Sequence, residues 1–124
     1  MAKKLFLIVA VLLFGAGVIF SCTYDEITPQ VVEVPDNVSF SMDVLPIFIN
    51  TCAQSGCHAS NGIPPNLSPD NAYISLTFFG YVDLGTPENS KIYQKITTGS
   101  MKNFATDQDR AIILRWIEQG ALDN

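Results

Sequence analysis

The residues that most constrain this chain are two of its three cysteines and its one histidine, which lie together in Cys52-Ala53-Gln54-Ser55-Gly56-Cys57-His58. A small domain buries a limited core, so a covalent cross-link would contribute much of its stability. Two thiols this close have two uses outside the cytoplasm: they close a disulfide, or they bind a cofactor covalently. The segment therefore decides what kind of small domain this is.

The order Cys, Cys, His favours the cofactor. Two cysteines followed at once by a histidine form the attachment arrangement of c-type haem: the thiols of Cys52 and Cys57 add to the haem vinyl groups, and the imidazole of His58 is the proximal iron ligand. The common spacer has two residues, and here there are four. On a helix at about 100° per residue, the longer spacer turns Cys57 away from Cys52 by about 140°. The extra residues are therefore expected to bulge, which Gly56 permits.

The N-terminus has the order of a secretory signal. Lys3 and Lys4 precede an uncharged apolar run over residues 5–20, and Ile19-Phe20-Ser21-Cys22 follows. The run is shorter than the roughly 20 residues of a membrane-spanning helix. Its last residues resemble the lipobox of bacterial lipoproteins, which implies cleavage before Cys22, diacylation of its thiol and stable anchoring by several acyl chains. An uncleaved signal-anchor helix with an incidental cysteine is the alternative.

These features predict three parts: a lipoprotein signal peptide over 1–21, a lipid-anchored tether over 22–37 and a folded domain over 38–124. The tether has prolines, acids and no sustained period. Residues 1–21 contain two of the 7 basic residues and none of the 12 acidic ones, so the mature chain is more acidic than the net charge of −5 indicates. This balance argues against a nucleic-acid partner.

Start and stop signals predict four short helices and no strand in the domain, hence an all-α fold. The last helix begins with a capping box, Thr106-x-x-Asp109, and ends at Gly120. The other three helices are expected to begin at Ser41, at Ser68-Pro69 and at Thr86-Pro87.

Further motifs extend over residues 38–124. Asp43-Val44-Leu45-Pro46-Ile47-Phe48 precedes the cysteines; Gly85-Thr86-Pro87-Glu88-Asn89-Ser90-Lys91-Ile92-Tyr93, a methionine and Trp116-Ile117-Glu118-Gln119-Gly120-Ala121 follow in that order. Together they resemble the small cytochrome c domains of many bacterial lipoproteins, often described as planctomycete-type cytochrome c. The resemblance implies a class I-like cytochrome c fold, with an N-terminal helix crossing the C-terminal helix over one covalently bound haem.

The sixth iron ligand has to come from elsewhere in the chain, because His58 is the only histidine. Met1 leaves with the signal peptide, so Met42 and Met101 remain. Met42 lies in the first helix and is expected in the core. Met101 follows Gly99 in a loop, where the family places its methionine ligand. Met101 is therefore the expected distal ligand, and an open or water-bound position is the alternative.

The expected function is one-electron transfer by a mono-haem c-type cytochrome, anchored as an outer membrane lipoprotein at the periplasmic or cell-surface face. Its partners would be redox proteins. No acid–base pair or nucleophile constellation indicates an enzyme. Two alternatives stay open: a five-coordinate haem peroxidase or gas-binding protein, and a haem-free binding lipoprotein stapled by a disulfide between Cys52 and Cys57. Several aromatic residues could form a haem wall, but aromatics at helical spacing are more often plain core, so none is assigned to the haem: Tyr73, Phe78, Phe79, Tyr81 and Phe104.

Overall fold

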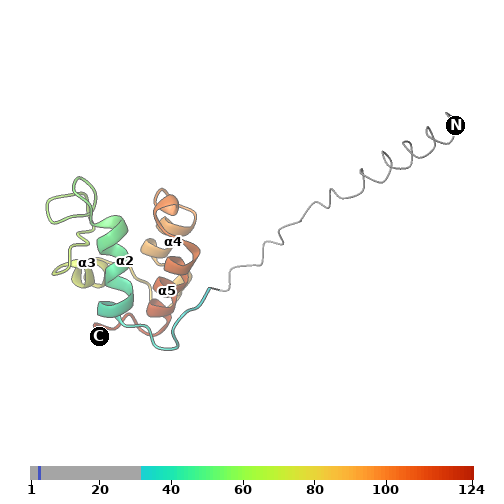
Figure 1. Ribbon diagram of the computed structural model, residues 1–124. Helices are drawn as coiled ribbons and strands as arrows, with labels where there is room; N and C mark the ends of the chain where they lie inside the picture. The colour runs from blue at the N-terminus through green and yellow to red at the C-terminus, as the bar shows by residue number, and fades with distance from the viewer. Residues whose placement is uncertain (1–2, 4–31) are drawn as a thin grey trace. The chain divides into compact units, whose positions relative to one another are not determined.

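The computed structural model describes Lys3 and residues 32–124 (Figure 1), so the predicted signal peptide, the lipidation site Cys22 and the start of the tether lie outside the described domain. Contacts divide the chain into two units, Met1–Gln30 and Val31–Asn124. Every regular element over 32–124 is helical, which confirms the all-α prediction. Among the described residues, no helix combines the length and apolar character needed to cross a membrane. The elements are η1 (Phe40–Val44), α2 (Leu45–Ile47), η2 (Phe48–Cys52), α3 (Ala72–Phe78), η3 (Pro87–Asn89), α4 (Lys91–Thr97), η4 (Lys102–Phe104) and α5 (Asp107–Glu118).

η1, α2 and η2 follow one another without a break and form the first helix of the domain. Pro46 lies in its middle and supplies no N–H, so the regular α-helical ladder is interrupted there. On either side, the helix uses wider π-type bonds that span five residues. Leu45 N donates to the Phe40 carbonyl, and Ala53 N donates to the Phe48 carbonyl at 2.7 Å. The proline is thus accommodated by widening the helix.

The N-cap of this helix is Ser39, so the predicted start at Ser41 is wrong. The Ser39 hydroxyl accepts a hydrogen bond from Met42 N at 3.2 Å, and the Asp43 carboxylate accepts one from Ser39 N at 2.8 Å. The Ser41 hydroxyl donates instead to the backbone oxygen of Asn124 at 2.8 Å. The Ser39 hydroxyl makes the same contact at 2.7 Å, so both serines bind the far end of the sequence, and only Ser39 also caps the helix.

Two other predicted starts are also displaced. α3 begins at Ala72, and Ser68 lies in the turn that precedes the helix. The Ala72 N–H donates to the Ser68 carbonyl, with an N···O distance of 2.9 Å. Thr86 precedes only the single 3₁₀ turn η3, because Ser90 has ψ 129° and interrupts the helix. The buried Ser90 hydroxyl accepts a hydrogen bond from Asp83 N at 2.9 Å. α4 therefore begins after this residue, and ends just before Gly99 as predicted.

The capping box of α5 is confirmed. Thr106 Oγ1 accepts from Asp109 N at 3.1 Å, while the Asp109 carboxylate accepts from Thr106 N at 2.8 Å. These two bonds satisfy backbone donors that have no partner within the first turn of a helix. The start of α5, which lies beside the predicted site, is therefore fixed by its own local sequence.

The core lies where the first helix and α5 meet. Trp116 of α5 is fully buried, and its ring centroid lies 5.2 Å from that of Phe40 in η1. Tyr73 of α3 meets Phe40 edge-on at 5.3 Å, so three helices converge on one aromatic cluster. α4 also packs against α5. The buried apolar residues are Val38, Phe40, Val44, Phe48, Leu67, Ala72, Leu76, Ile92, Ile96, Ile113, Trp116, Ile117 and Ala121.

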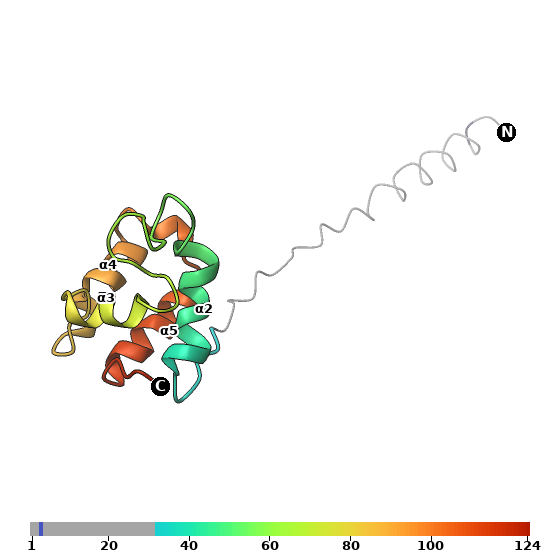
Figure 2. The ribbon, with the colours of Figure 1, turned by 90° about the vertical axis from the view of Figure 1, so that its left-hand side faces the viewer.

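Two long connections lie at the same end of this helical frame. The green loop that follows η2 and the orange segment that follows α4 both lie at the upper end of the domain in the two views (Figures 1 and 2). The first of these connections contains Cys57 and His58, and the second contains Met101. The helices thus bring the two predicted ligand segments into one region.

Candidate functional site

Cys52 is the last residue of η2, and the four-residue spacer leaves the helix immediately after it. Cys57 N donates to the Gln54 carbonyl at 2.9 Å, which closes a turn. Gly56 has φ +79°, a left-handed conformation that side chains disfavour. The expected bulge at Gly56 is therefore present, and it places Cys57 off the helix while His58 N still donates to the Cys52 carbonyl at 3.2 Å.

The imidazole of His58 is held through one of its two nitrogens. Nδ1 lies 2.8 Å from the carbonyl oxygen of Ile63 and 3.1 Å from that of Pro65. Carbonyl oxygens only accept, so Nδ1 carries the hydrogen and donates it. In the neutral ring, Nε2 then keeps its lone pair, the state required of a metal ligand.

The loop after His58 folds back tightly on Cys57. Ile63 N donates to the Cys57 carbonyl at 2.6 Å, and Leu67 N donates to the His58 carbonyl at 2.8 Å. The Leu67 side chain is buried in the core. A Cβ at Gly62 would lie 2.0 Å from the Cys57 oxygen, a separation that no side chain tolerates. The position of the Ile63 carbonyl, and through it the His58 ring, thus depends on glycine at 62.

Met101 lies in the connection between α4 and α5 and is half-buried against the core. Its N–H donates to the Lys95 carbonyl of α4 at 2.9 Å, and its own carbonyl accepts from Phe104 N at 3.0 Å. Gly99 permits the close return of the chain, because a Cβ there would lie 2.8 Å from the Lys95 Cα. The backbone on both sides of Met101 is therefore bonded to its surroundings.

The structure brings four predicted site residues to one surface crevice with a cavity of about 140 Å³. Its lining residues are Thr51, Cys52, Gly56, Cys57, His58, Ile63, Met101 and Phe104. Met42 lies elsewhere: its side chain is 77% exposed on the first helix, so the expectation that it belongs to the core is wrong. Phe40 and Val44 of the same turn are buried, and at about 100° per residue Met42 points to the side of the helix opposite them. Of the two methionines, only Met101 therefore lines the crevice.

The aromatic residues divide among three environments. Phe104 lines the crevice, whereas Tyr73 belongs to the core cluster with Phe40. Phe78 and Phe79 are exposed at the end of α3 and contact each other edge-on at 5.4 Å. Only Phe104 among these candidates is therefore a wall of the crevice.

The two thiols are free and differ in exposure: Cys57 is exposed and Cys52 is half-buried. Burial raises the pKa of the Cys52 thiol above its ordinary value, because the thiolate would lose solvation. The Thr51 hydroxyl, 3.2 Å from the Cys52 sulfur, opposes this rise, and the negative charge of Asp109 adds to it. Cys52 is thus a neutral thiol at neutral pH.

The donor set fits a covalently held haem. The crevice offers two thiols, an imidazole nitrogen with a free lone pair and a thioether, on walls that also include Ile63 and Phe104. Its volume is below the roughly 300–1,000 Å³ of typical small-molecule pockets, so a haem would need the two loops to lie farther apart. Within the described range 32–124 and at Lys3, no three side chains of His, Cys, Asp and Glu gather as a metal-binding group.

Sequence reasoning did not identify the partners that orient these ligands. The carbonyls of Ile63 and Pro65 hold the His58 ring, and the guanidinium of Arg110 bonds the loop that contains Met101. The proline pair at 64–65 indicated a loop but not its hydrogen bonds, because any residue supplies a carbonyl. Arg110 gave no signal apart from its charge.

Comparison of the chain with protein-family models, with curated proteins and with solved structures gives no match. The geometry of the crevice and the order of the motifs therefore carry the functional argument.

Proposed function

We propose that this protein is a mono-haem c-type cytochrome that transfers single electrons outside the cytoplasm. Cys52 and Cys57 would hold the haem by thioether bonds, His58 would be the proximal iron ligand and Met101 the distal one. The observation that carries the proposal is the meeting of these four side chains at one crevice from segments about forty residues apart in sequence.

The protein's own residues prepare both sides of such a site. The carbonyls of Ile63 and Pro65 fix the hydrogen of His58 on Nδ1 and leave Nε2 to bind iron. The thioether of Met101 is a soft ligand that favours ferrous iron and raises the reduction potential. Bound haem supplies a reversible one-electron couple. The exposed position of Cys57 leaves one edge of the crevice open to a redox protein partner.

We further propose that the domain is tethered as an outer membrane lipoprotein, at the periplasmic or cell-surface face. The support is the short uncharged run before Ile19-Phe20-Ser21-Cys22. Acylation at Cys22 would add several chains, enough for stable anchoring. Haem attachment outside the cytoplasm is consistent with an exported chain.

The test is covalent haem. The full chain is expressed with haem-maturation machinery, separated by denaturing electrophoresis and stained for haem, because thioether bonds survive denaturation. We expect a stained band in the wild type and in Met42→Ala, and no stained band when Cys52→Ala and Cys57→Ala are combined. An unstained wild-type band would overturn the proposal and favour the disulfide-stapled alternative.

A further inference from the structure

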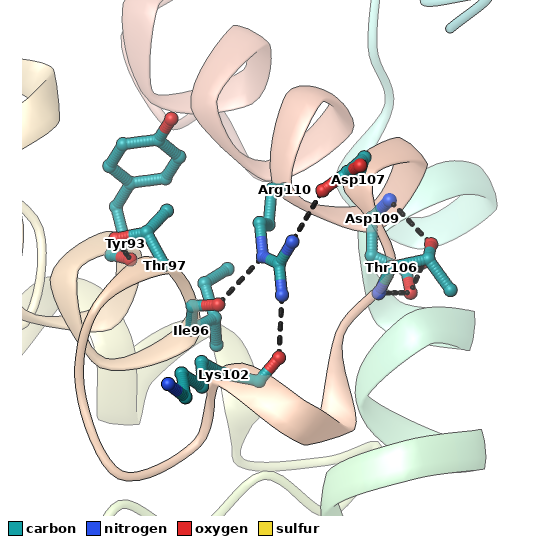
Figure 3. Close-up of polar contacts among 8 residues, drawn as sticks. All are labelled: Tyr93, Ile96, Thr97, Lys102, Thr106, Asp107, Asp109 and Arg110. Atoms are coloured by element: carbon teal, nitrogen blue, oxygen red, sulfur yellow. Dashed lines mark hydrogen bonds and ion pairs between the residues drawn. The ribbon is translucent and has the colours of Figure 1, made fainter. Parts of the chain in front are cut away.

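Arg110 makes contacts on the connection that carries Met101, and none of the functions proposed so far uses them. It lies in the first turns of α5, and its guanidinium bonds three groups at once (Figure 3). Nε donates to the Ile96 carbonyl at 2.7 Å, and one terminal nitrogen donates to the Lys102 carbonyl at 2.5 Å. The other terminal nitrogen pairs with the Asp107 carboxylate at 2.5 Å.

The two carbonyls lie on opposite sides of Met101 in sequence. Ile96 is in the last turn of α4, and Lys102 directly follows Met101. A single planar group therefore holds both ends of the short segment 97–101 at a fixed separation. Carbonyls only accept, so both bonds need N–H donors. The planar arginine fork directs two donors to fixed positions, a geometry that the compact ammonium of a lysine does not reproduce.

The backbone that carries the Arg110 guanidinium is held in place at the start of α5. Arg110 N donates to the carbonyl of the N-cap Thr106, whose capping box fixes the start of α5. The Arg110 side chain is only 23% exposed, so its bonds to the loop are partly shielded from water. Charged hydrogen bonds of this kind are stronger than neutral ones. The first turn of α5 and the Met101 segment are thus coupled through one side chain.

We propose that Arg110 is a positioning residue that determines where Met101 presents its thioether to the crevice. This inference rests on the proposed function, in which Met101 is an iron ligand. Without the clamp, the segment 97–101 keeps its own backbone hydrogen bonds but loses its restraint by α5, and the methionine would spend more time off the iron. The population that binds an external ligand then rises in proportion.

The test compares Arg110→Gln and Arg110→Lys with Arg115→Gln and Arg115→Lys in the full, haem-loaded chain. Arg115 is the matched control: it lies on the same helix, but it pairs with Glu118 and bonds the Asp36 carbonyl, away from the Met101 segment. Three quantities are measured: the methionine–iron charge-transfer band, the rate of carbon monoxide binding to the ferrous protein, and amide hydrogen exchange over 98–104.

We expect Arg110→Gln to weaken the band and to speed carbon monoxide binding by about tenfold or more, because it removes both charged hydrogen bonds to the loop. Arg110→Lys should fall between Gln and wild type, and it decides the matter if Arg110→Gln does not fold. Exchange over 98–104 should rise in both. Arg110 variants that behave like the Arg115 variants would overturn the inference.

A wild type without covalent haem would overturn the proposed function and the ligand role of Met101 together. Hydrogen exchange would then still report the clamp separately, because it needs no haem. Faster exchange over 98–104 in the two Arg110 variants than in the two Arg115 variants would support the restraint of the loop by Arg110, whereas equal exchange in all four variants would overturn it.

Discussion

The two methionines of the domain illustrate how surroundings decide the use of one side chain. Met101 lines the crevice with His58, and its backbone is bonded on both sides. Met42 projects from the first turn of the first helix into solvent. The buried face of the first helix contains Phe40, Val44 and Phe48. Met42 is about 200° from Phe40 around the helix, so it lies on the exposed face.

Replacing each methionine by alanine tests the distal ligand. Met101→Ala should abolish the methionine–iron charge-transfer band and lower the reduction potential, since the thioether favours ferrous iron. Met42→Ala should keep the band and change the free energy of unfolding by no more than about 0.5 kcal/mol, as exposed substitutions do. Visible spectroscopy and a redox titration measure both effects. A band that survives in Met101→Ala and disappears in Met42→Ala would reverse the assignment.

The cysteines make a second prediction in the haem-free, reduced chain. Cys57 is exposed, whereas burial raises the pKa of the Cys52 thiol, so iodoacetamide should modify Cys57 first at neutral pH. The raised pKa also gives stability a direction with pH. In the unfolded chain the Cys52 thiol ionises at about pH 8.5, below its pKa in the folded protein. The free energy of unfolding should therefore fall as the pH rises from the unfolded pKa through the folded pKa.

Peptide mapping after brief alkylation measures the order of reaction, and denaturant titrations across alkaline pH measure the slope. Cys52→Ala is the control, because it should remove the part of the slope due to this thiol while leaving Cys57 reactive. Equal reaction of both cysteines in the folded chain would contradict the prediction.

At the scale of elements, sequence signals succeeded where both partners are local. Thr106 and Asp109 form their capping box within one turn, and the sequence was sufficient to predict it. Ser39, and not Ser41, caps the first helix, although both hydroxyls donate to the backbone oxygen of Asn124 at the other end of the sequence. Ser90 interrupts the helix expected from Thr86, because its hydroxyl is used by Asp83 in the preceding loop. Helix ends set by distant contacts carry no local signature.

The loop between Cys57 and Leu67 gives the third prediction. Gly62→Ala should lower the free energy of unfolding by about 1–3 kcal/mol, because a Cβ there overlaps the Cys57 carbonyl. In the haem-loaded protein it should also change the absorption spectrum, including the methionine–iron charge-transfer band, since the same loop supplies the Ile63 carbonyl to His58. Gly85→Ala is the matched control: its nearest neighbour would lie at 3.4 Å, an ordinary contact.

Thermal or denaturant unfolding of the two glycine variants, with spectra recorded on the same samples, measures both effects. A Gly62→Ala protein as stable as Gly85→Ala, with an unchanged spectrum, would show that the loop does not support the site as described.

At the scale of the molecule, the domain is organised around the meeting of its first and last helices. The two helices pack through an aromatic cluster of Trp116, Phe40 and Tyr73, which come from three elements. The loop after η2 and the segment after α4, which contain the candidate ligands, lie at the same end of the domain (Figure 2). The sequence could indicate the candidate ligands, because cysteine, histidine and methionine are rare in this chain. It could not identify the supports, because carbonyls and one arginine acquire their roles only once distant segments are packed.

Residues 32–37 show how the folded part of the chain begins. They bond along α5: the Gln108 side chain donates to the Glu33 carbonyl, and the Gln119 side chain donates to the Asp36 carbonyl. The Gln119 side-chain oxygen also accepts from Val38 N at 2.9 Å. The last part of the predicted tether therefore lies along the domain, and the unit 31–124 has its own core and its own crevice.

This organisation predicts that anchoring and haem binding are separable. Cys22→Ala removes the acylated thiol, so the protein should leave the membrane fraction or remain unprocessed, while Thr23→Ala should stay membrane-bound. In both variants the haem-stained band and the methionine–iron band should match the wild type, because every residue of the crevice belongs to the unit 31–124. Membrane fractionation, lipid labelling and absorption spectra on the same cells measure these outcomes. Equal lipid label in Cys22→Ala would rule out this cysteine as the anchor, and a Cys22→Ala protein that is exported but lacks haem would show that the two functions are coupled.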